Sequence, residues 1–289
     1  MALWQAEFIR SELERYHPDL RVELVGMTTK GDRWLQSPLS EIGGKGLFIK
    51  ELEAAMLAGE ADIAVHSMKD LPAELPPEFC LPVIAYREEV ADVLVSGAGS
   101  LQDLQNGAKV GSSSLRRQAQ LKALRPDLNV QPIRGNVDTR LKKLDDGEFD
   151  AIVLAAAGLN RLGLERSGIE RLSVDQSLPA PGQGALGIEC LVDSPAIEFL
   201  QPLMDEGVSR CVRAERGISL GLGADCSLPV AAYAQLDGEN IHLRALLASP
   251  DGKRILRSHG HHPDPEQLAK DLVADLMAQG ANEILAELG

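Results

Sequence analysis

The stretch AKVGSSSLRRQAQLKAL, residues 108–124, contains the transition that decides the fold. Small and β-branched residues at 108–111 predict a short strand, a glycine and three serines predict a turn, and a helical pattern follows over 114–124. A buried strand that passes through a tight turn into a helix is the repeating unit of an α/β sheet. The stretch therefore predicts the α/β class, with a helix N-terminus beside the end of a strand.

Similar patterns occur on both sides of this stretch. Further strands are predicted at 22–25, 61–65, 81–86, 91–95, 129–133, 150–155 and 185–190, and helices at 2–16, 47–58, 136–145 and 155–162. This alternation over residues 1–195 predicts largely parallel sheets. The charged stretch 87–91 and the Pro- and Gly-rich stretch 177–185 are predicted to be two crossings between two α/β lobes. One lobe is then inserted into the other, with a cleft between them.

The pattern changes after about residue 206. A helix at 208–220 leads into three alternating runs at 228–236, 240–248 and 253–259, and Asp-Gly pairs stand at the two junctions between these runs. Asp-Gly pairs favour tight hairpin turns. A long amphipathic helix follows at 265–287. This region predicts a small antiparallel α+β domain.

The composition excludes several functional classes. The chain has 289 residues and a formal net charge of -14, whereas nucleic-acid binding needs a basic face. No segment approaches the roughly 18–20 apolar residues of a membrane span, and no secretory signal opens the sequence, so a cytoplasmic location is expected. The cysteines lack metal-type spacing, and the histidines at 259, 261 and 262 are interpreted as a solvated strand edge. No metal site is predicted.

Arginine is concentrated near the turns that follow strands. Arg116 and Arg117 stand just after GSSS, and Arg134 and Arg140 flank the junction RGNVDTR. Helix N-termini and guanidinium groups both bind carboxylate or phosphate, although a serine helix cap explains part of the pattern. Arg161, after the next strand, is equally compatible with an ordinary exposed helix arginine. Taken together, the arginines predict a site for a small ligand with several carboxylates.

The hexapeptide VHSMKD, residues 65–70, follows directly from a predicted strand. The carboxyl end of a strand is where an open α/β sheet presents its ligand-binding groups. Asp70 can accept hydrogen bonds from N–H groups or hold a cation, and Ser67 and Lys69 can meet an anion. A solvated loop above a packed His66 explains the same residues equally well.

Two loops contain further candidates. GGKGLFIKE, residues 43–51, lacks the spacing of a phosphate-binding loop but leaves Lys45 able to reach a carboxylate. An exposed loop lysine is about as good an explanation. Cys226 lies in the loop GLGADCS, where a thiol can be approached and alkylated, although an unreactive loop cysteine is the more common case. The other three cysteines are predicted to be buried thiols.

The motifs VHSMKDLP, GSSSLRRQAQL, RGNVDTRLKKLDDGEFDAIVLAAAGLNRLGL and LPAPGQGALGIEC, with the loop of Cys226, resemble the hydroxymethylbilane synthases (porphobilinogen deaminases) in order and spacing. The resemblance extends from residue 2 essentially to the C-terminus. It implies a monomeric α/β enzyme with two doubly wound, periplasmic-binding-protein-like domains and a third, small α+β domain with a three-stranded antiparallel sheet. The implied domains are 1–86 with 185–203, 90–178, and 206–289.

The resemblance also implies a reaction, a cofactor and residue roles. The family joins four porphobilinogen molecules head to tail and releases ammonia. It carries a covalent dipyrromethane cofactor on a loop cysteine, which matches Cys226. Asp70 matches the catalytic aspartate, which is expected to stabilise the cation formed as ammonia leaves. The cofactor-binding positions match Ser67, Lys69, Ser112, Ser113, Ser114, Arg116 and Arg117. The positions that bind substrate carboxylates match Arg134, Arg140, Arg161 and Lys45.

The sequence departs from the family pattern in two places. The family usually begins with a strand and an Arg- and Ser-containing loop ahead of the position of Met1, so we expect a first strand to be missing from the numbered sequence. Glu41 stands where some members have lysine, and it receives no role. Two alternatives to an active enzyme stay open. A two-lobed small-anion binding protein would carry no pyrroles on Cys226, and a truncated or inactive paralogue would release no ammonia from porphobilinogen.

Overall fold

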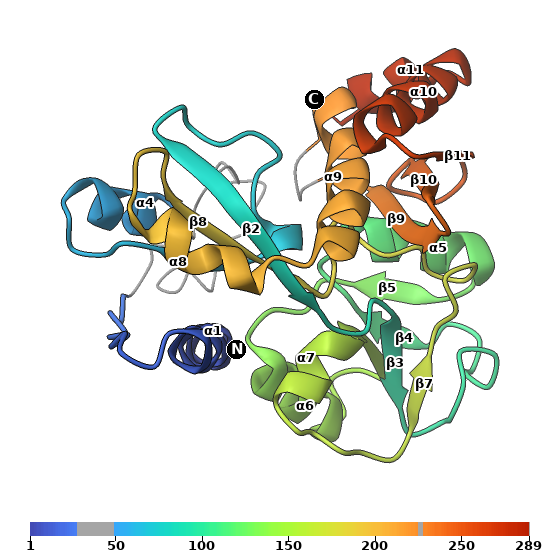
Figure 1. Ribbon diagram of the computed structural model, residues 1–289. Helices are drawn as coiled ribbons and strands as arrows, with labels where there is room; N and C mark the ends of the chain where they lie inside the picture. Colours follow the sequence, from blue (N-terminus) through green and yellow to red (C-terminus); the bar gives the residue numbers. More distant parts are fainter. Residues whose placement is uncertain (28–48, 225–227, 289) are drawn as a thin grey trace.

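The computed structural model describes residues 1–27, 49–224 and 228–288. In these ranges the chain forms three separate sheets, each packed with its own helices (Figure 1). None of the described helices combines the length and the apolar composition that a membrane crossing requires. The prediction of two α/β lobes and a small antiparallel α+β unit is confirmed.

The first sheet has the strand order β1-β8-β2. Its strands are β1 (Ala64–Ser67), β2 (Phe79–Arg87) and β8 (Ala185–Leu191). The helices of this lobe are α1 (Ala2–Tyr16), α4 (Lys50–Leu57) and α8 (Ala196–Leu200), with the short 3-10 turns η1 (Met68–Asp70) and η2 (Gln201–Leu203). Ile9 and Leu13 of α1 pack against Val83 and Ile188 in the core of the lobe.

The described pairings of this sheet are antiparallel, which corrects the prediction of largely parallel strands. The central strand β8 returns from the other lobe and runs opposite to both of its neighbours, so no helical crossover connects it to either strand. The strand predicted at 22–25 is also wrong, because residues 21–27 have no regular structure. A strand needs a partner for its backbone groups, and no described segment pairs with this one.

The second sheet has the strand order β5-β4-β6-β3-β7. Its strands are β3 (Asp92–Ser96), β4 (Lys109–Gly111), β5 (Asn129–Gln131), β6 (Ala151–Ala155) and β7 (Ile169–Arg171). Its helices are α5 (Leu115–Leu124), α6 (Val137–Asp145) and α7 (Ala156–Arg161). The strands linked through α5 and α6 are parallel, as predicted, but β3 runs antiparallel to β6 and β7. β3 enters from the first crossing and not through a helix, so its direction is independent of the helical crossovers.

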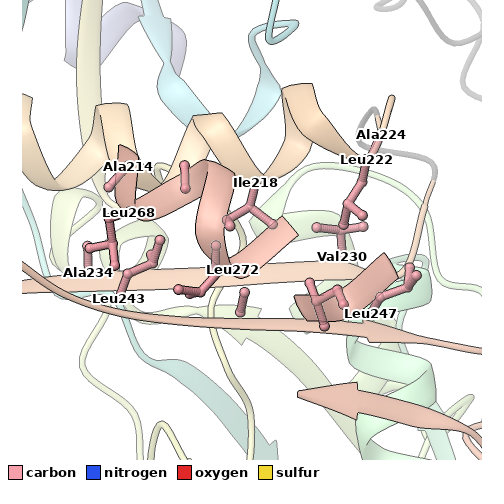
Figure 2. Close-up of a cluster of buried hydrophobic side chains, with 14 of the residues drawn as sticks. Ala214, Ile218, Leu222, Ala224, Val230, Ala234, Leu243, Leu247, Leu268 and Leu272 are labelled. Carbon is pink, nitrogen blue, oxygen red and sulfur yellow. The ribbon is translucent and has the colours of Figure 1, made fainter. Parts of the chain in front are cut away.

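The third sheet is the antiparallel meander β9 (Val230–Asp237), β10 (Asn240–Ala248) and β11 (Ile255–His262). Its helices are α9 (Glu206–Gly221), α10 (Pro265–Ala278) and α11 (Ala281–Ala286). Figure 2 shows Ala214 and Ile218 of α9, with Leu268 and Leu272 of α10, packed over this sheet. The single helix predicted at 265–287 is interrupted at Gly280, whose φ of +100° breaks the helix.

Helix α9 lies between the first and third units. It packs on β9 and β10 through its apolar face and also contacts β2 of the first lobe (Figure 1). The backbone N–H of Val208 donates to Asp205 at the start of α9, at 2.9 Å, which caps the helix. The third unit is therefore held against the lobe that contains β1 and the VHSMKD turn.

Candidate active site

The predicted catalytic turn directly follows the first strand of the first sheet. β1 ends at Ser67, whose hydroxyl accepts a hydrogen bond from Gln5 Nε2 at 2.7 Å, and η1 ends at Asp70. Met68 is buried beneath this turn, against the second crossing. Gly182 of that crossing has a φ of +72°, and a Cβ there would lie 2.7 Å from the Cβ of Met68. Because glycine adopts this conformation freely and leaves this space, the crossing lies directly against the turn.

Asp70 and Lys69 are neighbours on this turn but have different surroundings. Asp70 is exposed, and its side chain has no hydrogen-bond or ion-pair partner among the described residues. Lys69 is half-buried, and desolvation lowers the pKa of its ammonium group. Arg117 and Arg116 lie close enough to lower this pKa further, whereas Asp70 and Asp92 oppose the shift. The turn thus brings the predicted catalytic aspartate next to a cluster of cations.

Both arginines of the GSSSLRR motif turn inward and bind one buried carboxylate, that of Asp92 at the start of β3. Arg116 Nη1 lies 2.7 Å from Asp92 Oδ2, and Arg117 Nη2 lies 2.7 Å from Asp92 Oδ1. Arg117 Nε donates to the same Oδ1 at 3.0 Å. The sequence predicted that both arginines bind the cofactor. In the structure a large part of each guanidinium group has a partner within the protein, and contact with the cofactor stays a prediction.

The Asp92 carboxylate is the centre of a buried polar network. It also accepts hydrogen bonds from Ser177 Oγ at 2.7 Å and from Gln183 Nε2 at 2.9 Å. Burial by itself would raise the pKa of Asp92, but the two guanidinium groups more than compensate and hold this pKa well below its ordinary value. We call these five side chains, the two arginines included, the Asp92 network. It connects β3, α5 and the second crossing.

Arg134 and Arg140 occupy the next strand-to-helix junction. Arg140 Nε donates to the carbonyl oxygen of Gly135 at 2.7 Å. Desolvation lowers the pKa of Arg140, and the charges of Arg117 and Arg134 lower it further, while Asp70 opposes the shift. Arg134 is half-buried and has no hydrogen-bond or ion-pair partner among the described residues. The two junctions therefore share one electrostatic environment with Asp70.

The mutual effects of these groups define a cationic cluster. Its members are Lys69, Arg116, Arg117, Arg134 and Arg140, and the nearby carboxylates are Asp70 and Asp92. Among the residues that the structure describes, these five basic groups are accompanied by two carboxylates, so the described part of the cluster carries an excess of positive charge. Several like charges held together in a partly desolvated site repel one another unless an anion joins them. The arrangement is suited to a ligand with more than one carboxylate.

The three serines of the GSSS turn all have internal partners. Ser113 Oγ donates to the carbonyl oxygen of Ile133 at 2.6 Å and accepts from its backbone N–H at 3.1 Å. Ser114 caps α5, and the Ser112 hydroxyl accepts from the Ser114 backbone N–H at 3.3 Å. These serines hold the turn between two strand ends. The sequence predicted cofactor contacts for them, and the structure assigns them at least this structural role.

Arg161 lies apart from the cationic cluster. Its Nη2 donates to the carbonyl oxygen of Gly184 at 2.6 Å, and its guanidinium carbon lies 5.4 Å from the ring centroid of Trp4. Desolvation lowers the pKa of Arg161, while the charge of Glu88 opposes the shift. Its Nε is buried and has no hydrogen-bond partner among the described residues. In this arrangement Arg161 connects α7 to the second crossing and to α1.

Two predicted site residues, Cys226 and Lys45, lie outside the described residues. The other cysteines are free thiols, and burial raises the pKa of Cys190 to about 12 and that of Cys211 to about 11. Cys80 is only half-buried, and its sulfur lies 3.7 Å from that of Cys190. Within the described ranges no cluster of three or more His, Cys, Asp or Glu side chains is arranged to hold a metal ion.

Sequence reasoning missed two buried carboxylates that organise the site. Asp92 is one, and Glu215 of α9 is the other. The guanidinium group of Arg87 binds both carboxylate oxygens of Glu215, at 2.9 and 3.0 Å. Glu215 also accepts the backbone N–H groups of Gly182 and Ala234. The sequence did contain a signal, because both acidic residues stand where the pattern requires an apolar residue. Asp92 lies at the start of a buried strand, and Glu215 lies on the apolar face of a helix.

Comparison with solved structures finds several matches of low sequence identity. The probable amino-acid ABC transporter extracellular-binding protein ytmK from Bacillus subtilis has a TM-score of 0.42 and 15% identity, and the match covers 72% of this chain and 84% of that one. The Bordetella pertussis BvgS VFT2 domain has a TM-score of 0.40 and 16% identity, and the match covers 68% of this chain and 75% of that one.

Comparison with sequence families gives a more specific result. Residues 1–198 match the model of the porphobilinogen deaminase dipyrromethane cofactor binding domain, and residues 209–278 match that of the porphobilinogen deaminase C-terminal domain. A porphobilinogen deaminase from Thiobacillus denitrificans is 53% identical over 292 residues, which cover 100% of this chain and 95% of that protein. The chain therefore belongs to the porphobilinogen deaminase family.

Proposed function

We propose that this chain deaminates porphobilinogen and joins four molecules of it head to tail into hydroxymethylbilane, as a transferase of tetrapyrrole biosynthesis. The observation that carries the proposal is the cationic cluster beside the exposed Asp70. Porphobilinogen has two carboxylates, and every unit added to a growing chain brings two more. A site for such a chain needs several fixed cations, and guanidinium groups bind carboxylates through two hydrogen bonds at once.

The described residues fit a dipyrromethane cofactor. Within the described ranges Arg134 has no partner, and the buried Arg116 Nε has no hydrogen-bond acceptor. Lys69, Arg117, Arg134 and Arg140 would hold the acid side chains of the cofactor and of the bound substrate, and Cys226 would carry the thioether. When bound, the cofactor supplies a tethered pyrrole to which new units are added. Tethering makes each addition intramolecular.

Asp70 is the proposed catalytic residue. As ammonia leaves porphobilinogen, positive charge develops on the pyrrole, and a fixed carboxylate beside it stabilises that charge. The Asp70 side chain is exposed and has no competing partner among the described residues, so its charge is available to the substrate. The surrounding cations bind the substrate through its acid side chains and so orient its pyrrole ring against Asp70.

The proposal extends to the division of the chain. We assign residues 1–86 and 185–203 to one domain, 90–178 to a second and 206–289 to a third. The separate sheets and separate hydrophobic clusters support this division. We also propose that the protein acts as a cytoplasmic monomer. Light scattering on the purified protein tests the monomer, and fractionation of the producing cells tests the location.

The test compares Asp70→Asn with Asp62→Asn, since Asp62 is an exposed aspartate just before the same strand β1. Ammonia release from porphobilinogen is measured, together with the intact mass of the purified protein. We expect Asp70→Asn to lower kcat by at least about 100-fold, because a fixed charge at the reacting centre typically contributes this much. Asp62→Asn should retain kcat.

The intact mass tests the tether independently. The unsubstituted protein should carry an added mass of two pyrrole units, and Cys226→Ser should lack it and release no ammonia. Full turnover by Asp70→Asn would contradict the assignment of Asp70. An unmodified Cys226 in an active protein would contradict the assignment of the cofactor site.

A further inference from the structure

Arg216 of α9 makes an unusual set of contacts with the first lobe. Its Nη1 donates to the carbonyl oxygen of Leu71 at 3.1 Å, and its Nη2 donates to those of Pro72 at 2.6 Å and Ala73 at 3.0 Å. These three carbonyl groups belong to consecutive residues, and the first of them directly follows Asp70. One guanidinium group therefore holds the backbone that leaves the catalytic turn.

These contacts are made at an electrostatic cost. Desolvation lowers the pKa of Arg216 to about 10, and no carboxylate among the described residues forms an ion pair with it. Its hydrogen-bonding partners are uncharged carbonyl groups. The segment from Leu71 onwards is neither helix nor strand, so its carbonyl groups lack the partners that regular structure provides. The planar guanidinium group of an arginine has several N–H donors and can bind three adjacent carbonyl groups at once. The ammonium group of a lysine does this less well.

The helix that carries Arg216 is rigidly placed. The preceding residue, Glu215, is fully buried and binds Arg87 and two backbone N–H groups. On the other side, Ala214 and Ile218 are buried in the core of the third unit (Figure 2). The chain continues from the end of α9 into the loop that contains Cys226.

The Arg216 contacts act on the backbone directly after Asp70. The Asp70 side chain has no partner of its own among the described residues, so the backbone on either side sets its location. On the N-terminal side, Ser67 pairs with Leu186 in the sheet. On the C-terminal side, the Leu71 backbone N–H donates a long hydrogen bond, of 3.4 Å, to the Met68 carbonyl oxygen. The Arg216 contacts add a polar restraint on the backbone after the turn, next to the buried side chain of Leu71.

We propose that Arg216 is a positioning residue for catalysis. It fixes the turn of Asp70 relative to α9, and so holds the carboxylate in place beside the cationic cluster that binds the substrate. This inference rests on the proposed role of Asp70. The competing explanation is that Arg216 only docks the third unit on the first lobe.

Arg210 provides a matched control on the same helix. Its Nη2 also donates to two backbone carbonyl groups, those of Glu239 at 2.7 Å and Pro263 at 2.8 Å, but both acceptors lie within the third unit. Replacing Arg210 removes an arginine from the same helix and similar backbone contacts without touching the catalytic turn. A general loss of α9 stability should therefore appear in both variants, and a loss of positioning only in the variant at Arg216.

The experiment compares Arg216→Gln, Arg216→Lys and Arg210→Gln as full-length proteins purified with their cofactor. The measurements are kcat and KM for porphobilinogen, the thermal midpoint, and the cofactor content from intact mass. We expect Arg216→Gln to lower kcat by about 10–100-fold, as a displacement of roughly 1 Å at a reacting group does. KM should change by less than about threefold, because the cationic cluster that binds substrate is intact. Arg216→Lys should recover part of kcat.

Two outcomes would overturn the inference. One is an unchanged kcat in Arg216→Gln with full cofactor content. The other is a fall in kcat no larger than that of Arg210→Gln at an equal thermal midpoint. If Arg216→Gln does not fold, a wild-type kcat in Arg216→Lys has the same meaning. Asp70→Asn in the same assay distinguishes failure of the proposed function from failure of this inference. Full activity of Asp70→Asn would contradict the catalytic role of Asp70. Loss of activity in Asp70→Asn together with a normal kcat in Arg216→Gln would contradict only the positioning role of Arg216.

Discussion

Replacement of Asp92 by asparagine tests how the second lobe is held together. Asp92 is fully buried and accepts hydrogen bonds from Arg116, Arg117, Ser177 and Gln183. The substitution conserves shape but removes the negative charge, and it places an amide N–H₂ group among donors. Two buried guanidinium groups then lose their counter-ion. Arg116 suffers most, because desolvation already lowers its pKa and Asp92 opposes that shift.

The magnitude follows from this geometry. Loss of one partner of a buried, hydrogen-bonded ion pair typically costs about 3–5 kcal/mol. In a chain of this size that corresponds to a fall in the thermal midpoint of about 5–8 °C. The control is Asp175→Asn, which breaks the exposed pair of Asp175 with Arg244 at 2.8 Å. An exposed pair contributes only about 0–1 kcal/mol, so the control should move the midpoint by no more than a few degrees. Differential scanning calorimetry measures both.

The pH dependence gives a second test of the same reasoning. Folding lowers the pKa of Asp92, so its stabilisation is complete above the unfolded pKa, near about 4, and is lost as the pH falls towards the folded pKa. The difference in thermal midpoint between the unsubstituted protein and Asp92→Asn should be constant from about pH 5 to pH 8. It should narrow below about pH 4. The ion-pair account would be refuted if Asp92→Asn lowered the thermal midpoint no more than Asp175→Asn does. It would also be refuted if the fall in midpoint of Asp92→Asn became larger at acidic pH.

Two further predictions follow from close contacts. Gly182→Ala places a Cβ 2.7 Å from that of Met68 at a φ of +72°, so we expect a loss of about 1–3 kcal/mol in unfolding free energy and a lower kcat, measured by calorimetry and ammonia release. Hydrogen peroxide should convert the Cys80 and Cys190 thiols into a disulfide and two waters, because their sulfurs lie 3.7 Å apart across paired strands. Peptide mapping should find this cross-link with Cys211 still reduced, and a pair that stays reduced would contradict the prediction.

The local elements of the fold could be predicted because their signals are local. The GSSSLRR stretch predicted a helix over 114–124, and α5 spans Leu115–Leu124 with Ser114 as its cap. The hairpins of the third unit follow from Asp-Gly pairs, with Asp237 opposite Asn240 in the register. Turn chemistry and capping act over a few residues, so the sequence contains them directly.

The directions of the strands and the partners of the arginines could not be predicted in the same way. The pairing of Arg117 with Asp92 could not be predicted, because the two residues are 25 positions apart in sequence. The antiparallel pairing of β8 with β1 and β2 likewise depends on a segment roughly 100 residues or more away. Such choices are settled by packing and charge neutralisation in three dimensions. The proximity of Asp70 to the cluster was implied by family resemblance, not by periodicity.

The two crossings between the α/β lobes lie side by side, and the Glu88 backbone N–H donates to the Gly184 carbonyl oxygen at 3.0 Å. The segment between them thus leaves and re-enters the first sheet through adjacent backbone positions. We expect that such a segment can be exchanged between related chains, because its removal leaves ends that a short linker can join. A graft of this kind must carry Gln183 together with Asp92, since the amide of one is bonded to the carboxylate of the other.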